Sequence, residues 1–134
     1  MKQSTITAYF KSSIERGWDV VTDNRNFAWR SDLSRIEMVD SERFIEYTKS
    51  GFATHFRITS KEPCRYYAFD IDNQNMSGHW TGIFEEDGEG TKMIFTEEVQ
   101  VKNPIMNLFV RGYLKKQQST YAADLRKALD ENVC

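Results

Sequence analysis

The succession of short strand-forming runs before one long helical segment constrains this fold more than any other feature of the sequence. Between residues 35 and 101, β-branched and aromatic residues recur in six runs that are bounded by Gly, Pro, Asn, Asp and Ser. The predicted strands are 35–39, 43–49, 54–60, 65–72, 78–85 and 91–101. Their connections are too short to hold a crossover helix, so we expect neighbouring strands to pair antiparallel, as a meander.

The two ends of the chain complete this pattern. Residues 4–11 form a further predicted strand, and Ser12-Ser13 favours the start of a helix over 14–21. Asn103 and Pro104 favour the start of a second helix, which runs without proline to Glu131. Its predicted apolar stripe contains Ile105, Leu108, Phe109, Gly112, Leu125 and Leu129, with Val110, Leu114, Gln117 and Tyr121 beside it.

Alternation along the strands gives the predicted sheet one large aromatic face, which must be covered by another layer. The C-terminal helix is the segment long enough to cover it. The sequence therefore predicts an α+β fold, in which a curved antiparallel sheet of about seven strands wraps around a long C-terminal helix. Short helices are expected to close one end.

Composition excludes several classes of protein. The 134 residues are enough for one domain, predicted to span 1–134, and 40% hydrophobic with 28% charged residues is typical of a globular chain. A net charge of −2 argues against binding of nucleic acid through phosphate contacts. Neither a signal peptide nor a stretch of about 20 apolar residues is present, so we expect no stable membrane insertion and a cytoplasmic location.

Several short motifs, in this order, resemble a known superfamily. They are the segment 18–23 with Phe27-Ala28-Trp29, then Gly78-His79-Trp80, the turn Gly88-Glu89-Gly90-Thr91, and the segment 125–129. The chain is similar to START-like, Bet v 1-like (SRPBCC) proteins, near the polyketide cyclase/dehydrase and lipid transport branch. Where many members carry Ala-Pro before the first helix, this chain has Ser12-Ser13. The resemblance implies the helix-grip fold, with an apolar cavity between sheet and helix, and no particular reaction.

The aromatic face is the candidate binding site. Periodicity alone favours an ordinary filled core, whereas the resemblance favours an open cavity. The candidate ligand-binding residues are Trp29, Phe56, Tyr67, Phe69, Trp80, Phe84, Phe95, Glu97, Phe109 and Tyr113.

Glu97 is the polar residue of greatest interest. It shares the parity of Met93, Phe95 and Val99, so a regular strand places its carboxyl inside, where burial would raise its pKa. The three non-apolar residues 96–98 also allow a bulge that turns Glu97 outward. Both orientations are open at this stage.

Other chemistry has weaker support. His55 and His79 fall on the opposite parity from the apolar faces, and neither has spaced partners, so no metal site is expected. Of the two cysteines, Cys64 and Cys134, Cys64 has no neighbouring base and is interpreted as a structural thiol. The turn at Gly88 lacks the lysine of a phosphate loop, and no cofactor is expected.

Two principal functions follow from these residues. The preferred one is binding or carriage of a small hydrophobic or amphipathic ligand, with Glu97 as polar anchor. The alternative is a cyclase or dehydratase acting on a polyketide-like or aromatic substrate without metal or nucleotide. The candidate catalytic groups are then Glu97 as base and Tyr67 or Tyr113 as donor. An interaction module, with a homodimer as one form, is a third reading.

Overall fold

The structure, a computed structural model, describes residues 2–130 and has one antiparallel sheet of seven strands in the order β1-β7-β6-β5-β4-β3-β2. The strands are β1 (Lys2–Phe10), β2 (Leu33–Met38), β3 (Arg43–Thr48), β4 (Ala53–Glu62), β5 (Tyr66–Asp72), β6 (Met76–Asp87) and β7 (Gly90–Val101). Strands β2 to β7 form the predicted meander, and β1 joins it beside β7. The predicted α+β class and the antiparallel meander are confirmed.

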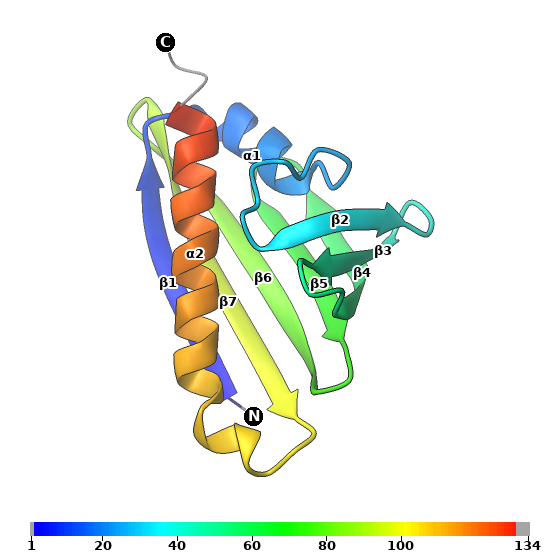
Figure 1. Ribbon diagram of the computed structural model, residues 1–134. Helices are drawn as coiled ribbons and strands as arrows, with labels where there is room; N and C mark the ends of the chain where they lie inside the picture. The colour runs from blue at the N-terminus through cyan, green and yellow to red at the C-terminus, as the bar shows by residue number, and fades with distance from the viewer. Residues whose placement is uncertain (1, 131–134) are drawn as a thin grey trace.

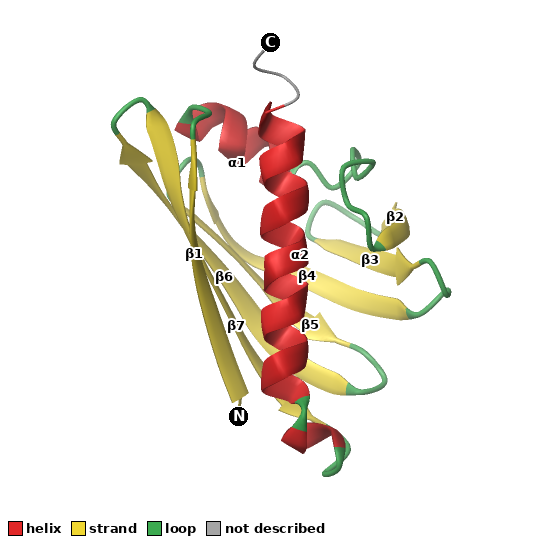
Figure 2. Cartoon of the chain, turned by 60° about the vertical axis from the view of Figure 1, so that its left-hand side comes forward, coloured by secondary structure: helices red, strands yellow, loops and turns green. Residues whose placement is uncertain are grey.

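A long helix lies on the concave face of this sheet. Helix α2 (Val110–Asp130) runs along β1 and β7, while strands β2 to β4 curl forward beside it (Figures 1 and 2). Its buried stripe is Val110, Leu114, Gln118, Ala122, Leu125 and Leu129. Within that stripe, Gln118 Nε2 donates to the carbonyl of Ser4 (2.8 Å) and Gln118 Oε1 accepts from Ser4 Oγ (2.8 Å). These bonds satisfy a polar group that burial would otherwise leave without a partner.

The beginning of this helix differs from the prediction. Asn103 does cap a turn, since its Oδ1 accepts from the Ile105 amide (2.9 Å), but that turn leads only into a short 3₁₀ helix, η1 (Met106–Leu108). The α-helix starts at Val110, so its phase is set independently of the turn before it. As a result, Ile105, Leu108, Phe109 and Gly112 of the predicted stripe are exposed. The predicted end at Glu131, and Cys134, lie outside the described residues.

Helix α1 (Ile14–Thr22) closes one end of the sheet. As predicted, Ser13 is its N-cap, with Oγ accepting from the Arg16 amide (3.3 Å). Its face of Ile14, Trp18 and Val21 is buried, and the Trp18 ring meets Phe84 edge to face at 5.1 Å between centroids. The chain then passes through a connecting loop, residues 23–32, before β2. Within the described residues, no helix has the length and hydropathy needed to cross a membrane.

Candidate functional site

A cavity of about 160 Å³ lies between the concave face of the sheet, the 23–32 loop and α2. Aromatic rings form much of its wall: Phe27, Trp29, Phe44, Phe52, Phe56, Tyr67, Phe69, Trp80, Phe95, Tyr113 and Tyr121. Charged residues also line it, namely Asp23, Arg30, Asp32, Glu46 and Glu97. Apolar walls with a few placed polar groups are typical of small-molecule sites.

The structure brings most of the sequence-predicted site residues to this cavity. Those in its lining are Trp29, Phe56, Tyr67, Phe69, Trp80, Phe95, Glu97 and Tyr113. Two predicted residues lie elsewhere. Phe84 is buried on the inner face of β6, four residues beyond Trp80, where α1 covers it, and Phe109 precedes α2 with 70% of its surface exposed.

The aromatic wall is closely packed. The Trp80 ring stacks on Phe69 with centroids 4.7 Å apart and planes 5° apart, and it stacks on Phe95 at 5.2 Å. Phe56 extends this layer, edge to face with Phe69 and stacked on Phe44 at 4.9 Å. Each ring is therefore held by at least one neighbour, and ring-to-ring packing fixes this side of the cavity.

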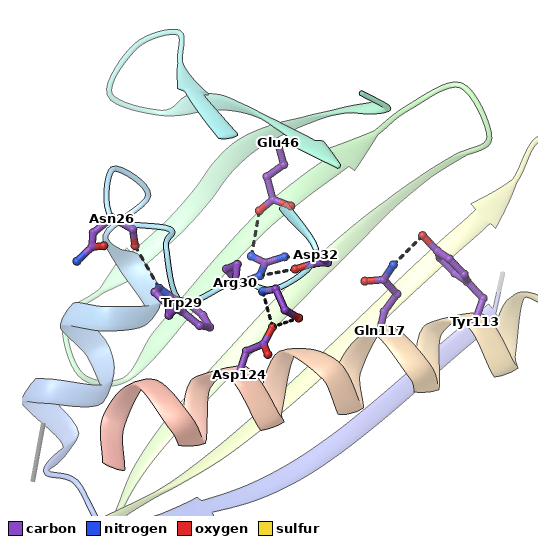
Figure 3. A network of polar contacts seen from close by, with 9 residues as sticks. Asn26, Trp29, Arg30, Asp32, Glu46, Tyr113, Gln117 and Asp124 are labelled. Atoms are coloured by element: carbon purple, nitrogen blue, oxygen red, sulfur yellow. Dashed lines mark hydrogen bonds and ion pairs between the residues drawn. The ribbon is translucent and has the colours of Figure 1, made fainter. Parts of the chain in front are cut away.

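The opposite wall is the 23–32 loop, which is attached to α2 (Figure 3). The amide and the hydroxyl of Ser31 both donate to Asp124 Oδ2, each at 2.8 Å. Trp29 donates from Nε1 to the carbonyl of Asn26 (3.1 Å), and its ring meets Tyr121 edge to face at 5.3 Å. The loop is thus fixed to the helix across the space above the sheet.

An ion-pair network at the centre of this loop was not predicted from the sequence. Arg30 donates from Nε and Nη2 to the two oxygens of Asp32 (3.2 Å each), and from Nη1 to Glu46 Oε2 (3.3 Å) (Figure 3). The guanidinium also lies over the Tyr121 ring, 4.9 Å from its centroid. A signal for Glu46 existed, because it alternates with Phe44 and Thr48 on the inner face of β3. Arg30 and Asp32 lie in a loop, where no periodicity marks the inner side.

Burial and the neighbouring charges shift the pKa values of the groups in this network. Burial lowers the pKa of the Arg30 guanidinium, but attraction to Glu46, Tyr121 and Asp32 outweighs burial and raises this pKa overall. For Glu46, burial is the largest effect and raises the pKa, in spite of the opposing attraction of Arg30. Arg30 therefore remains charged, and the carboxyl of Glu46 takes up a proton at a higher pH than an exposed glutamate does.

Glu97 points into the cavity, which settles the two orientations left open by the sequence. Its pairing with Ser4 on β1 and Trp80 on β6 belongs to registers that run without a bulge through residues 96–98. Its carboxyl forms no hydrogen bond or ion pair with any group that the structure describes. Burial, together with the negative charge of Glu46, raises the pKa of Glu97 to about 7, against the opposing effect of Arg30.

This raised pKa predicts a pH-dependent stability that replacement of Glu97 removes. The folded protein holds a proton that the unfolded chain releases near pH 4.5, so the contribution of Glu97 falls as pH rises through about 7. We expect Glu97→Gln to be about 3 kcal/mol more stable than the wild type at pH 8 and no more stable at pH 4. Urea unfolding at both pH values measures this difference. Glu98→Gln, on the other face of β7, should show no such divergence, and parallel pH profiles for Glu97→Gln and the wild type would contradict the assignment.

Three tyrosines surround the cavity. Tyr67 is buried and its hydroxyl accepts from Asn24 Nδ2 (3.2 Å), while the Tyr113 hydroxyl accepts from Gln117 Nε2 (3.0 Å). Burial raises the pKa of Tyr67, Tyr113 and Tyr121 above the usual phenol value. These hydroxyls therefore stay protonated at neutral pH. Because Tyr67 and Tyr113 act as acceptors in their hydrogen bonds, each can still donate its own proton to a group in the cavity.

The other reactive side chains lie away from the cavity. His55 is exposed on β4, and His79 pairs through Nδ1 with Asp70 Oδ1 (2.7 Å) on the outer side of the sheet, as their parity predicted. Burial, with nearby carboxylates, raises the pKa of the Cys64 thiol, which disfavours a reactive thiolate. Within residues 2–130, no three His, Cys, Asp or Glu side chains are grouped so that they could hold a metal ion.

Comparisons with known proteins agree with this architecture. A family model described as polyketide cyclase/dehydrase and lipid transport matches residues 1–130. A START superfamily protein from Mycobacterium smegmatis superposes with a TM-score of 0.89 at 10% identity, covering 96% of this chain and 97% of the other. A conserved protein from Geobacillus kaustophilus gives 0.85 at 12% identity, covering 97% and 96%. XoxI from Bacillus cereus gives 0.82 at 15% identity, covering 96% of each chain. At these identities the likeness shows a shared fold, and no curated protein matches the sequence.

Proposed function

The chain belongs to the polyketide cyclase/dehydrase and lipid transport family, and we propose that it binds a small apolar or amphipathic molecule in the cavity beneath α2. The observation that carries this proposal is the aromatic cavity itself, with polar side chains placed in an otherwise apolar wall. Binding follows from burial of apolar surface, at roughly 25 cal/mol per Å².

The volume of the cavity limits the ligand. An engineered apolar cavity of about 150 Å³ accommodates benzene, so the 160 Å³ present here suits one aromatic ring or a short chain. Tyr113, half exposed and part of the lining, marks a side on which the cavity reaches the surface. A longer molecule would extend outward past this residue while its buried end fills the cavity.

A substitution that fills the cavity tests this function. Ile36 lies on β2, half-buried in the lining, and Ile36→Trp would occupy the space that a ligand needs. We expect this variant to bind 2-phenylethanol at least 10-fold more weakly than the wild type by isothermal titration calorimetry. Native mass spectrometry of the purified protein should show a corresponding loss of any co-purified ligand.

Thr59→Trp provides the matched control, because Thr59 is exposed on β4 outside the cavity lining. It adds the same side chain and should bind 2-phenylethanol like the wild type. Circular dichroism checks that both variants are folded. Equal affinity of the wild type and a folded Ile36→Trp would place binding elsewhere and contradict the proposal.

One observation favours catalysis as the second candidate function. A carboxyl with a pKa of about 7 is suited to act as a general base at neutral pH, and Glu97 is close enough to Tyr113 for its charge to raise the pKa of that phenol. These two groups match a metal-independent cyclase or dehydratase acting on an aromatic or polyketide-like substrate. In that case Glu97→Gln would abolish turnover of such a substrate while leaving its binding measurable. Unchanged turnover would exclude Glu97 as the base.

A further inference from the structure

The charged groups that line the cavity are unbalanced. Asp23, Asp32, Glu46 and Glu97 contribute carboxyls, whereas Arg30 is the one basic residue among the described lining residues. The cavity therefore has an excess of negative charge whenever its carboxyls are ionised. An anionic ligand would be repelled there, since charges interact strongly where water is largely excluded.

Arg30 is not free to compensate an anionic ligand. Three of its nitrogens already donate to Asp32 and Glu46, and its guanidinium lies against the Tyr121 ring. Its side chain is 13% exposed, so turning toward a new partner would leave two carboxylates without their ion pair. Recognition of a carboxylate or phosphate by Arg30 would require that network to break.

Glu97, by contrast, has an acceptor group facing the cavity and no protein partner among the described residues. Two of its neighbours on the same face are aromatic, since it pairs across the strands with Trp80 and lies two residues from Phe95. A carboxylate beside aromatic rings suits an organic cation, because the ion pair holds the charged group while the rings contact the apolar part of the molecule.

We therefore propose that the ligand of this cavity is a small organic cation, in which an ammonium group contacts Glu97 and an aromatic or short apolar group fills the ring-lined space. This inference rests on the proposed binding function. It specifies the charge of the ligand, and it names Glu97 as the residue that selects a ligand of that charge. The aromatic wall supplies affinity for the apolar part, and Glu97 distinguishes an amine from a neutral or acidic molecule of the same size.

The protonation of Glu97 gives this proposal a pH signature. The titratable and charged groups that act on it are Glu46 and Arg30, and the Tyr113 phenol lies nearby. Glu97 itself changes charge near pH 7. A primary amine remains charged to about pH 10. The affinity for an ammonium ligand therefore rises as pH increases from 6 to 8, while the affinity for a neutral ligand does not rise with it.

Three probes of one shape and different charge test the proposal. They are the 2-phenylethylammonium ion, 2-phenylethanol and phenylacetate, titrated calorimetrically against the wild type at pH 6 and pH 8. We expect the ammonium ion to bind at least 10-fold more tightly than the alcohol at pH 8, and phenylacetate to bind most weakly. Glu97→Gln should bind the ammonium ion about 10-fold more weakly than the wild type does, and its affinity for the alcohol should change less than about 3-fold. Glu98→Gln should match the wild type with all three.

The outcomes separate this inference from the function on which it rests. If the alcohol or phenylacetate binds more tightly than the ammonium ion, the charge inference is wrong and binding in the cavity stands. The same conclusion follows if Glu97→Gln retains full affinity for the ammonium ion. If none of the three probes binds at millimolar concentration, the result counts against the proposed binding function, and the inference fails with it.

Discussion

Replacement of Trp80 by alanine is expected to lower the free energy of unfolding by about 3–5 kcal/mol, the range for removing a large aromatic side chain from a core. Trp80 is 8% exposed and stacks on both Phe69 and Phe95. Gly82 makes this packing feasible, because a Cβ at that position would lie 2.7 Å from the indole ring. Removing the ring would enlarge an existing cavity and take away the ring on which Phe69 and Phe95 stack.

Urea unfolding monitored by circular dichroism measures this loss. Ile83→Ala is the matched control, since Ile83 is an exposed apolar residue of the outer face on the same strand and its replacement should cause a much smaller loss. Trp80→Phe should recover part of the stability, because a smaller ring can still stack. A loss below about 1 kcal/mol in Trp80→Ala would mean that the stacked wall contributes little, and that neighbouring rings move into the space.

The sheet was predictable because its strands are short, alternate in polarity and have short connections. Inner-face residues such as Phe56, Tyr67 and Trp80 follow from parity alone, and the structure confirms their side of the sheet. The same parity indicated that Glu97 points inward. The sequence could not exclude a bulge there, because the hydrogen-bonding register becomes visible only in the structure. Parity also places Phe84 on the inner face. Parity does not show, however, whether α1 or a cavity covers a residue of that face.

The phase of the C-terminal helix was mistaken for an identifiable reason. Leu114 lies about three full turns before Leu125 and shares its face, whereas Gly112 lies on the opposite side. The true stripe is interrupted by Gln118, a polar residue whose burial depends on bonds to β1. The apolar residues 105–109 supplied a stronger hydrophobic signal, although they precede the helix and are mostly exposed.

The polar part of the site was the least predictable. Asp32 and Arg30 lie in a loop without periodicity, and Glu46 is an inward carboxylate that only its ion pair with Arg30 makes acceptable inside a protein. Such a pair depends on contacts between a loop and a strand 16 residues apart in sequence. Local patterns identify the apolar wall of a cavity, and they do not identify charges that are brought together by tertiary structure.

Replacement of Arg30 by methionine is expected to lower the free energy of unfolding by about 3 kcal/mol at pH 8. Removing one partner of a buried pair leaves the other charge uncompensated, which costs more than the pair itself contributes. Here two carboxylates lose their partner, with side chains 28% exposed for Asp32 and 16% for Glu46. Methionine retains much of the length of the arginine stem, but it loses the guanidinium that lies over the Trp29 and Tyr121 rings.

The pH dependence of this loss identifies its electrostatic origin. Burial already raises the pKa of Glu46, and without Arg30 that pKa rises further, as does the pKa of Glu97. A carboxyl whose pKa is raised by folding destabilises the folded state as pH increases, so the deficit of Arg30→Met relative to the wild type should shrink from pH 8 to pH 5. Arg43→Met, which breaks the exposed pair with Asp40, should leave stability nearly unchanged at both pH values. A deficit that is equal at pH 5 and pH 8 would assign the effect to lost packing, and the cavity would then lack the uncompensated negative charge on which selection of a cation depends.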